Sequence, residues 1–459
     1  MRRKSSSALL ADGRAEAAGS LESGAWDLSR PPTTASPSSA RRTTKYHDEE
    51  ESGGSGGNNA EPTEPAAAAE PADDGQLAEE RKSLRSGARR ASRVTDHHSR
   101  ERERQLPPEN LVGHTSGVCS VIADDDRYIV SSSMDRSVKV WSRASFACLH
   151  TLFGHRDNVS CVALNMRWLV SGSHDTTLRV YSCVDGFRLL HALSGHAAHV
   201  TKVLLPAAQP QQILSCSDDA SVRVWSGERG VCLVVLRGHA SRVTCMHTDG
   251  ERVCTGAADS AVMFWDLPTL SVVSRAADSR RRGQRRPLES ESELRAARAF
   301  HVHTATVQAL VASRSVDGTL VLSGSTDGTI QIFNFETAEY VGRLDHVHSP
   351  VYSLCALPNG ELLCSTGDGR LLHFSDLFRH PLVKSELRLA AQWISMLQLR
   401  GRTVACSSED LLYVVDAEQL AVLAVIESNH GFVNSVSWLH ATALLSGGQD
   451  NVVKVWRLT

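Results

Sequence analysis

The amino-acid sequence predicts an all-β repeat domain that follows a disordered, charged N-terminal segment. Three observations support this prediction. Residues 1–104 are rich in Ala, Ser, Arg, Glu, Gly and Pro, and poor in aromatic and β-branched residues. From Leu111 to the end of the chain, short apolar alternations are separated by turn residues, as in a succession of short strands. In that part, histidine, aspartate and aromatic positions recur about every 40 residues, which is typical of a repeat fold.

The N-terminal segment, residues 1–104, is predicted to be disordered because its composition cannot bury enough apolar surface to offset the loss of chain entropy. Its charges lie in blocks: 11 acids and no Lys or Arg from Tyr46 to Glu80, then nine basic residues and three acids from Arg81 to Arg104. Three Arg-Arg-x-Ser/Thr patterns, which resemble basophilic kinase sites, end at Ser5, Thr44 and Ser92. These residues are candidate phosphorylation sites, where phosphate would add negative charge beside arginine.

The overall composition argues against several classes of protein. The formal net charge is −3, so no global basic field favours nucleic acid. The sequence has no apolar run of the roughly 18 residues that a membrane span requires, and no apolar stretch of signal-peptide length follows its N-terminus. The 11 cysteines form no Cys-x-x-Cys pair, and several lie in apolar runs, as in a reducing compartment. We therefore predict an intracellular protein, in the cytoplasm, the nucleus or both, without membrane contact.

Residues 105–459 form the predicted repeat domain. Each unit carries a histidine before its first strand, small hydroxyl residues at the end of its second strand, an aspartate in the next turn and an aromatic residue that closes its third strand. The histidine, aspartate and aromatic positions are, in chain order, His114, Asp135 and Trp141; His155, Asp175 and Tyr181; His196, Asp219 and Trp225; His239, Asp259 and Trp265; His303, Asp327 and Phe333; His348, Asp368 and Phe374; and His430, Asp450 and Trp456.

An eighth, degenerate unit surrounds Asp410 and is the seventh along the chain. No histidine precedes Asp410 at the usual distance, and no aromatic residue closes this unit. With Asp410 included, successive turn aspartates lie 40, 44, 40, 68, 41, 42 and 40 residues apart. The single long interval indicates one insertion, over about residues 275–298, between the fourth and fifth units.

The insertion contains a basic cluster from Arg280 to Arg286, followed by the acids Glu289, Glu291 and Glu293. A basic cluster can bind nucleic acid, an acidic partner or an import receptor. The alternative, which we favour, is a flexible loop whose basic and acidic halves neutralise one another.

The repeat closely resembles that of WD-repeat proteins over about 355 residues, although the literal Trp-Asp pair occurs only at Trp265-Asp266. The resemblance implies a closed β-propeller, of eight blades or of seven if the Asp410 unit forms no blade. It implies that a strand from residues 106–112 completes the last blade and closes the ring. It also implies that His, Ser, Asp and Trp of each unit form a hydrogen-bonded tetrad, so the repeated residues are structural rather than catalytic.

The chemical motifs of common enzymes are absent from the sequence. It contains no Gly-x-x-x-x-Gly-Lys-Ser/Thr phosphate loop, no His-Glu-x-x-His zinc site and no kinase signature. The histidines outside the repeat show no metal-ligand spacing. We therefore expect a protein without catalytic residues, metal, cofactor or small-molecule substrate.

In WD-repeat proteins, the loops around the central axis of one face usually bind partners. By this resemblance, the candidate positions follow the first apolar residue of each first strand or precede each turn aspartate. As the candidate partner-binding face we single out His174, Gln308, Tyr352 and Asn434 from these positions, together with His199 and Arg242. The face has few arginines, which argues against phosphopeptide recognition.

Three functions are compatible with these features. The first is an interaction scaffold that binds proteins or peptides through the propeller faces. The second is a substrate receptor of a ubiquitin ligase, because the short regular repeats resemble those of F-box/WD-repeat proteins. Against it, no F-box-like helical segment precedes Leu111, and no strand ends in Trp-Asp-x-Arg, the nearest match being Trp141-Ser142-Arg143. The third, which has weaker support, is RNA or chromatin binding through the arginine clusters.

Overall fold

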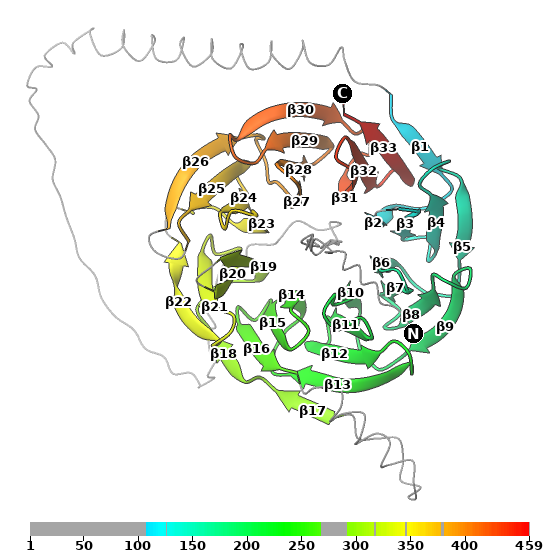
Figure 1. The fold of residues 1–459 in the computed structure, drawn as a ribbon, viewed down its shortest axis with the longest axis horizontal. Helices are drawn as coiled ribbons and strands as arrows, with labels where there is room; N and C mark the ends of the chain where they lie inside the picture. The colour runs from blue at the N-terminus through cyan, green and yellow to red at the C-terminus, as the bar shows by residue number, and fades with distance from the viewer. Residues whose placement is uncertain are drawn as a thin grey trace, which may run out of the picture. The chain divides into compact units, whose positions relative to one another are not determined.

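A computed structural model describes residues 107–124, 126–267, 292–315, 318–344, 347–377 and 381–458. These residues form 33 strands, and no helix is assigned within the described ranges. The strands make eight sheets that follow one another around a ring (Figure 1). The prediction of an eight-bladed β-propeller is therefore confirmed, whereas the predicted disordered segment, residues 1–104, lies outside the described residues.

Each blade consists of consecutive strands, apart from the last blade and the strands near the insertion. Blade 1 contains β2 (Val118–Ala123), β3 (Tyr128–Ser133), β4 (Val138–Ser142) and β5 (Cys148–Leu152). Blade 2 contains β6 (Val159–Leu164), β7 (Trp168–Ser173), β8 (Leu178–Ser182) and β9 (Arg188–Leu193). Blade 3 contains β10 (Val200–Leu204), β11 (Gln212–Ser217), β12 (Ser221–Ser226), β13 (Val231–Arg237) and β17 (Ser292–Arg295). Blade 4 contains β14 (Val243–Thr248), β15 (Arg252–Ala257), β16 (Val262–Asp266) and β18 (Arg298–Phe300).

The remaining blades follow the same order. Blade 5 contains β19 (Val307–Ser315), β20 (Gly318–Ser325), β21 (Ile330–Asn334) and β22 (Glu339–Leu344). Blade 6 contains β23 (Val351–Ala356), β24 (Leu362–Thr366), β25 (Arg370–Ser375) and β26 (Leu382–Arg388). Blade 7 contains β27 (Met396–Arg400), β28 (Thr403–Ser408), β29 (Leu411–Asp416) and β30 (Ala421–Glu427). Blade 8 contains β31 (Val433–His440), β32 (Ala443–Gly448), β33 (Val452–Arg457) and β1 (Glu109–Val112).

The period-two pattern of the strands directs each blade's side chains toward its two neighbours. In β4, Val138 and Val140 join an apolar cluster with Val159 of blade 2. Trp141, the next residue along the same strand, packs with Val453 of blade 8 instead. Because successive side chains of a strand point to opposite faces, each blade buries apolar surface against both neighbours. A single blade would leave both faces exposed to water, so the blades stabilise one another.

Close approach between blades depends on glycine near the end of several second strands. A Cβ added at Gly256 would lie 2.5 Å from Cγ1 of Val307, the first residue of β19 in the next blade. At Gly447 an added Cβ would lie 2.6 Å from Cγ1 of Val118, the first residue of β2. Interiors packed at this density leave no room for an extra methyl group, so a larger side chain would push the blades apart.

The N-terminal strand closes the ring. Strand β1 pairs antiparallel with β33, with Glu109 opposite Val455 and Val112 opposite Val452. The inner strand β31 of blade 8 in turn contacts β2 of blade 1. This arrangement agrees with the expectation that residues 106–112 would complete the last blade. Closure leaves no open sheet edge between the first and last blades, and such an edge could template aggregation.

The insertion changes the two blades that it connects. Its last part forms β17, which pairs parallel with β13 and gives blade 3 a fifth strand. Strand β18 then pairs antiparallel with β16 as the outer strand of blade 4. The expected loop over about 275–298 is therefore wrong for residues 292–295, where Leu294 packs against an apolar cluster and Glu293 pairs with Arg237 at 2.9 Å. The basic cluster Arg280–Arg286 lies outside the described residues.

Candidate functional site

Hydrogen-bonded side chains hold the turns that carry the repeated aspartates. In blade 1, the two ring nitrogens of His114 lie 2.8 Å from Asp135 Oδ2 and 2.8 Å from Ser131 Oγ, and Trp141 Nε1 donates to Ser131 Oγ at 2.9 Å. A neutral imidazole with its proton on Nδ1 satisfies every group. The ring donates to the carboxylate and accepts from the serine hydroxyl, whose oxygen accepts from the indole. These bonds join the turn to the second and third strands.

The same four-residue chain is present in blades 3 and 8. His196 contacts Asp219 and Ser215 at 2.8 Å each, and Trp225 donates to Ser215 at 2.8 Å. The blade 8 residues are His430, Asp450, Ser446 and Trp456. In these three blades the structure brings the predicted residues together within hydrogen-bond distance.

Blades 2, 4 and 5 keep the histidine–aspartate contact but differ at the closing aromatic residue. His155 lies 2.9 Å from its aspartate, and His303 lies 3.2 Å from its aspartate, while Tyr181 and Phe333 stand in place of tryptophan. The closing residue of blade 4 is a tryptophan, Trp265. Its Nε1 is nevertheless buried without a hydrogen-bond partner among the described residues.

Blade 4 lacks this last bond although its histidine is in place. His239 Nε2 lies 2.7 Å from Thr255 Oγ1, and Thr255 occupies the position that serine holds in blades 1, 3 and 8. His239 Nδ1 lies 3.0 Å from Asp259 Oδ2. The expected role of Trp265 as a hydrogen-bonding member of a tetrad is therefore not seen in this blade.

Blade 6 departs from the expected contact. His348 is exposed, and Asp368 accepts hydrogen bonds from Thr366 Oγ1 at 2.6 Å and Arg370 Nε at 2.5 Å. The arginine follows the aspartate by two residues and supplies a charged donor, so the carboxylate is satisfied without the histidine. The assignment of His348 and Asp368 as hydrogen-bonding partners is wrong for this reason, and Phe374 is buried in the core without them.

Blade 7 is a full four-stranded sheet although its sequence lacks the histidine and the aromatic residue. Asp410 accepts hydrogen bonds from Ser428 Oγ at 2.5 Å and from the backbone N–H of His430 at 2.7 Å. Both donors lie in the loop that leads into blade 8. The degenerate unit thus forms a blade, and its aspartate bonds to the next blade instead of its own turn.

The turn aspartates are held in the ionised state. Burial by itself would raise the pKa of Asp135, but hydrogen bonds with His114, Ser137 and the backbone N–H of Thr115 hold that pKa well below its usual range. The same balance lowers the pKa of Asp175, Asp219 and Asp327. Carboxylates of this kind act as fixed acceptors at neutral pH and do not exchange protons with a substrate. Their geometry fits a structural role.

Several positions expected on the partner-binding face instead connect neighbouring blades. Asn434 is buried, and its Nδ2 donates to the carbonyl oxygen of Val118 at 2.9 Å. Three hydroxyl groups at the equivalent positions donate to the next blade in the same way: Ser160 to Val200, Thr201 to Val243 and Thr244 to Val307. The proposal of Asn434 as a partner contact is therefore wrong, because its amide is used to join two blades.

The residue immediately before the first strand is at least partly exposed in six blades, whereas Gly117 of blade 1 and Ser395 of blade 7 are buried. In seven blades the carbonyl oxygen of this residue accepts a bond from the backbone N–H of the residue before the turn aspartate. The donor and acceptor pairs are Met134 and Gly117, His174 and Asn158, Asp218 and His199, Ala258 and Arg242, Thr326 and Thr306, Gly367 and Pro350, and Gln449 and Phe432. We call the surface formed by these pairs, together with Tyr352, Trp393 and Glu409, the aspartate face.

One arc of the aspartate face, over blades 2 to 4, is polar. The imidazoles of His174 and His199 stack with their centroids 4.3 Å apart and their planes at 10°. Nδ1 of His199 lies 3.5 Å from Asp218 Oδ2. Arg242, in the next blade, is exposed. Three of the predicted contact residues therefore lie in one arc, while Gln308, half-buried in blade 5, lies beyond it.

The other arc, over blades 6 to 8, is aromatic. The ring centroid of Tyr352 lies 5.3 Å from that of Trp393, which in turn lies 5.6 Å from that of Phe432. All three side chains are half-buried. The backbone carbonyl of Glu409, whose side chain is exposed, accepts a hydrogen bond from Val433, the residue after Phe432. We call Tyr352, Trp393 and Phe432 the aromatic row.

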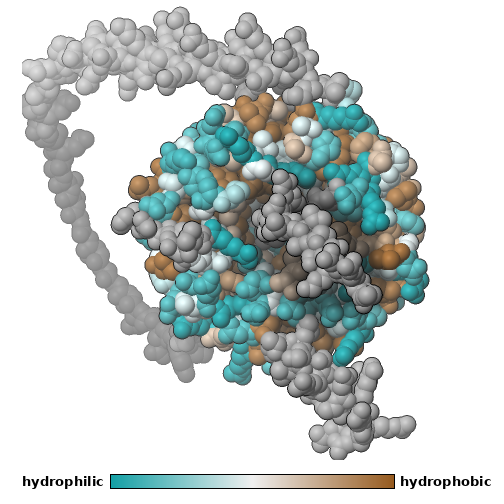
Figure 2. Space-filling model, viewed as in Figure 1, coloured by the Kyte–Doolittle hydropathy of each residue, from teal (hydrophilic) through white to brown (hydrophobic). Residues whose placement is uncertain are grey.

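Trp393 and Phe432 were missed as site residues by the sequence analysis. Phe432 immediately precedes Val433, the buried first residue of β31, and Trp393 immediately precedes Ile394, a buried residue two positions before β27. That position is the available signal, and it lies two residues before the position after the first apolar residue that the sequence analysis used. Hydrophilic and hydrophobic residues are interspersed over the face of the ring that Figure 2 shows.

Other chemistry was sought within the described ranges. No group of three or more His, Cys, Asp or Glu side chains there could hold a metal ion. No helix in the described part is long and apolar enough to cross a membrane. None of the 11 cysteines, all of which lie in the described ranges, forms a disulfide. Burial raises the pKa of Cys161 to about 12 and that of Cys216 to about 11, so these thiols are poor nucleophiles. The candidate phosphorylation sites Ser5, Thr44 and Ser92 lie outside the described residues.

Comparison with known proteins adds relatives of several kinds. Over 173 residues the chain is 30% identical to Autophagy-related protein 16 of Arabidopsis thaliana, covering 36% of this chain and 34% of that protein. Over 330 residues it is 26% identical to Cell division control protein 4 of Saccharomyces cerevisiae, covering 65% of this chain and 40% of that protein. Over 349 residues it is 23% identical to Ribosome biogenesis protein YTM1 of Kluyveromyces lactis, covering 66% of this chain and 76% of that protein. The chain thus spans about a third of the length of the plant protein and two fifths of the budding yeast protein.

Among solved structures, the computationally designed Ika8 protein shares the fold, with a TM-score of 0.64 and 22% sequence identity. The match covers 76% of this chain and 98% of the designed chain. At this identity the likeness concerns the fold alone.

The family model described as "WD domain, G-beta repeat" matches residues 106–142, 146–182, 187–226, 230–266, 295–334, 339–375 and 421–457. Each sequence repeat begins with the outer strand of one blade and continues with the first three strands of the next. This offset explains why β1, from the first repeat, completes blade 8. The unmatched stretch between the last two of these repeats, residues 376–420, contains most of the degenerate blade 7. Because the matches cover more than half of the chain, it belongs to the WD40-repeat family.

Proposed function

We propose that this protein is a non-catalytic interaction scaffold that binds a protein or peptide segment through its aspartate face. The observation that carries the proposal is the aromatic row, in which Tyr352, Trp393 and Phe432 come from three consecutive blades and are each half-buried. The rigid blades fix the positions of these rings, so little conformational entropy would be lost when a partner covers them.

Aromatic side chains in such a setting contribute strongly to binding. Tyr and Trp are enriched at the few interface positions that supply most of the binding energy, because one end is apolar and the other can form a hydrogen bond. The half-buried rings already pack against one another, so a partner would remove the remaining apolar surface from water. The row therefore fits the apolar centre of an interface.

The polar arc would fix the orientation of the bound segment on the aspartate face. His174, His199 and Asp218 supply donors and acceptors, and Arg242 supplies a positive charge across the ring from the row. Arg242 is the only arginine among the residues of the aspartate face, so a phosphorylated motif would find no clustered guanidinium groups there. We infer that the partner segment is unphosphorylated.

We further infer an intracellular location, in the cytoplasm or the nucleus, and no enzymatic activity. Eleven free cysteines, most of them buried, support the location, because secreted proteins commonly pair such residues. The low pKa of the turn aspartates and the raised pKa of the buried thiols support a role without catalysis.

The experiment is quantitative affinity purification of the full-length chain from native lysate, with mass spectrometry. Trp393→Ala removes the central ring of the aromatic row. Met166→Ala, an exposed residue in the turn between β6 and β7 at the other end of the strands, is the matched control. Proteins that are lost with Trp393→Ala and retained with Met166→Ala support binding through the aspartate face.

The same experiment separates the alternatives. Identical sets of partners for both variants would contradict a role for the aromatic row. Stoichiometric recovery of ligase adaptor subunits would replace the general scaffold with a ubiquitin-ligase substrate receptor. If the recovered partner proteins are lost after nuclease treatment, and their recovery falls steeply with salt, the result would favour nucleic-acid binding.

A further inference from the structure

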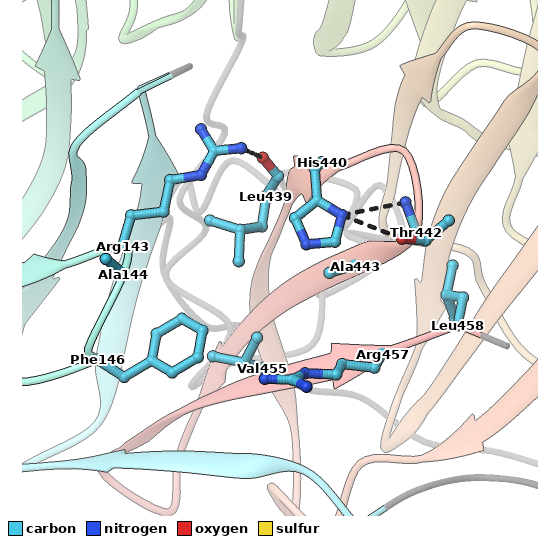
Figure 3. A pocket seen from close by; sticks show the side chains of 10 residues that line it. All are labelled: Arg143, Ala144, Phe146, Leu439, His440, Thr442, Ala443, Val455, Arg457 and Leu458. Carbon is cyan, nitrogen blue, oxygen red and sulfur yellow. Dashed lines mark hydrogen bonds between the residues drawn. The ribbon is translucent and has the colours of Figure 1, made fainter.

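A pocket lies where the ring closes, on the face opposite to the aspartate face. Its volume is about 460 Å³, and its lining includes Arg143, Phe146, Leu439, His440, Val455 and Arg457 (Figure 3). These residues come from the turn after β4, the end of β31 and the last residues of β33, next to the turn between β31 and β32. Because strands alternate in direction, these turns lie at the strand ends away from the aspartates. We call this site the seam pocket.

The floor of the seam pocket is apolar. Leu439 and Val455 are almost completely buried, and Phe146 is half-buried beside them. Figure 3 shows these side chains between the two arginines. A volume of this size matches the smaller ligand pockets of proteins, about 300–1,000 Å³, and suffices for one or two large apolar side chains.

The rim of the seam pocket is positively charged. Arg143 donates to the backbone carbonyls of Asp124 and Leu439, which bear no formal charge to neutralise it. Arg457 pairs with Glu109, the only carboxylate among the described residues that forms an ion pair with either arginine. The field of the arginines reaches His440: burial lowers the pKa of this residue, and Arg143, Arg400 and Arg457 lower it further.

His440 also presents a hydrogen-bond donor. Its Nδ1 accepts from the backbone N–H of Thr442 at 3.3 Å and lies 3.2 Å from Thr442 Oγ1. A neutral imidazole that accepts at Nδ1 carries its proton on Nε2. The ring can therefore donate to an anion placed at the rim.

The fold itself does not require an arginine at position 143. The backbone N–H of Arg143 closes a turn by donating to the backbone carbonyl oxygen of Arg127, and six other blades have the equivalent backbone bond. The residues that make it there are Cys183, Gly227, Leu267, Phe335, Ala417 and Leu458. None of them is basic, so among these seven blades only blade 1 has an arginine at this turn position.

We propose that the seam pocket binds an acidic peptide segment of a partner protein, in which a large apolar side chain lies next to carboxylates. The apolar side chain would enter the floor, and the carboxylates would face Arg143, Arg457 and His440. A small inorganic anion fits less well, because it would leave the apolar floor of the pocket uncovered. The site is separate from the aspartate face, so the two proposals stand or fall independently.

The test uses the full-length chain and a fluorescein-labelled peptide, Asp-Glu-Phe-Leu-Glu-Asp, with fluorescence anisotropy at low ionic strength. We expect binding that weakens as salt is added. Two comparison peptides, Lys-Arg-Phe-Leu-Arg-Lys and Asp-Glu-Ala-Ala-Glu-Asp, should bind at least about tenfold more weakly, since one reverses the charge and the other lacks the apolar side chains. Equal binding of either comparison peptide, or no binding of the first peptide, would overturn the proposal.

Two neighbouring substitutions localise the site. Ala144→Glu places a carboxylate on an exposed residue of the lining, and Ser145→Glu places it on the next exposed residue, outside the lining. We expect Ala144→Glu to weaken binding about fivefold and Ser145→Glu to change it less than about twofold. Trp393→Ala should leave it unchanged. Equal effects of the two glutamates, or displacement of the peptide by an equal concentration of inorganic phosphate, would contradict the assignment.

Discussion

Asn434 Nδ2 donates a hydrogen bond to the carbonyl oxygen of Val118 at 2.9 Å, across 316 positions of sequence. Val118 begins the inner strand of the first blade, and Asn434 is the second residue of the inner strand of the last. The bond therefore crosses the seam that the N-terminal strand closes. Hydroxyl groups of Ser160, Thr201 and Thr244 make the equivalent bonds at other blade boundaries.

Asn434→Ala should lower the free energy of unfolding by about 1–3 kcal/mol, because it leaves a buried carbonyl at the seam without its donor. Gln308→Ala is the matched control, since Gln308 occupies the equivalent position in blade 5 and is only half-buried. Chemical denaturation followed by tryptophan fluorescence measures both losses. An equal loss in the two variants would show that the seam bond contributes nothing specific.

Trp141→Phe should destabilise the protein more than Trp265→Phe. Both substitutions remove the same atoms from a buried site, but only Trp141 donates to a serine hydroxyl, at 2.9 Å. The Nε1 of Trp265 is buried without a partner among the described residues, so its removal relieves a desolvation cost. We expect a difference of about 1–2 kcal/mol in the free energy of unfolding. Thermal unfolding of both variants gives the order, and the reverse order would contradict the tetrad geometry.

Gly256→Ala should destabilise the protein by about 1–3 kcal/mol through overpacking, because the added methyl group would lie 2.5 Å from Val307 of the next blade. Gly342→Ala is the control: an added Cβ there has nothing within 4 Å. Since alanine restricts the unfolded chain more than glycine does, this control should be neutral or slightly stabilising. Melting temperatures of both variants at equal concentration test the pair. A loss of stability of the same size in both variants would mean that the effect arises from strand propensity and not from contact between blades.

The stability of the protein should fall as the pH is lowered from 7 to 5. Burial lowers the pKa of His239 and His430 below the ordinary value of 6.5. Around pH 6 the unfolded state therefore binds more protons than the folded state. The stability contribution of each neutral imidazole is complete above about pH 6.5 and is lost as the pH falls toward the folded pKa.

Denaturant unfolding at a series of pH values measures this dependence. His239→Asn and His430→Asn should each reduce the slope of unfolding free energy against pH in this window, whatever their effect on stability at pH 7. If both variants keep the full slope, the pH dependence arises elsewhere in the molecule.

Much of the fold could be predicted from local pattern. The 40-residue spacing of the turn aspartates and the alternation along strands such as β4 depend on neighbouring residues, so they are visible in the sequence. The closing strand β1 was instead expected from the resemblance to WD-repeat proteins, over residues 106–112. Blade 7 was harder to recognise, because its aspartate bonds to Ser428 and to the backbone of the next blade.

The candidate site was less predictable. His348 occupies the expected position, but Arg370 satisfies Asp368 through a contact that spacing does not reveal. Trp393 and Phe432 are 39 positions apart and become neighbours only when blades 7 and 8 lie side by side. The strand β17 was likewise hidden, because its partner β13 lies on the far side of the insertion.

The sequence by itself determined the repeated four-stranded unit, a ring of seven or eight such blades and the residues that hold the turns of blades 1, 3 and 8, because these depend on contacts repeated within one unit. Only the tertiary structure decided which polar residues join blades, as Asn434 does, and which reach the surface, as His199 and Trp393 do. The physical reason is that hydrogen bonds and apolar contacts between blades unite residues from separate repeats, and the position of a residue within its own repeat does not specify what the next blade presents to it.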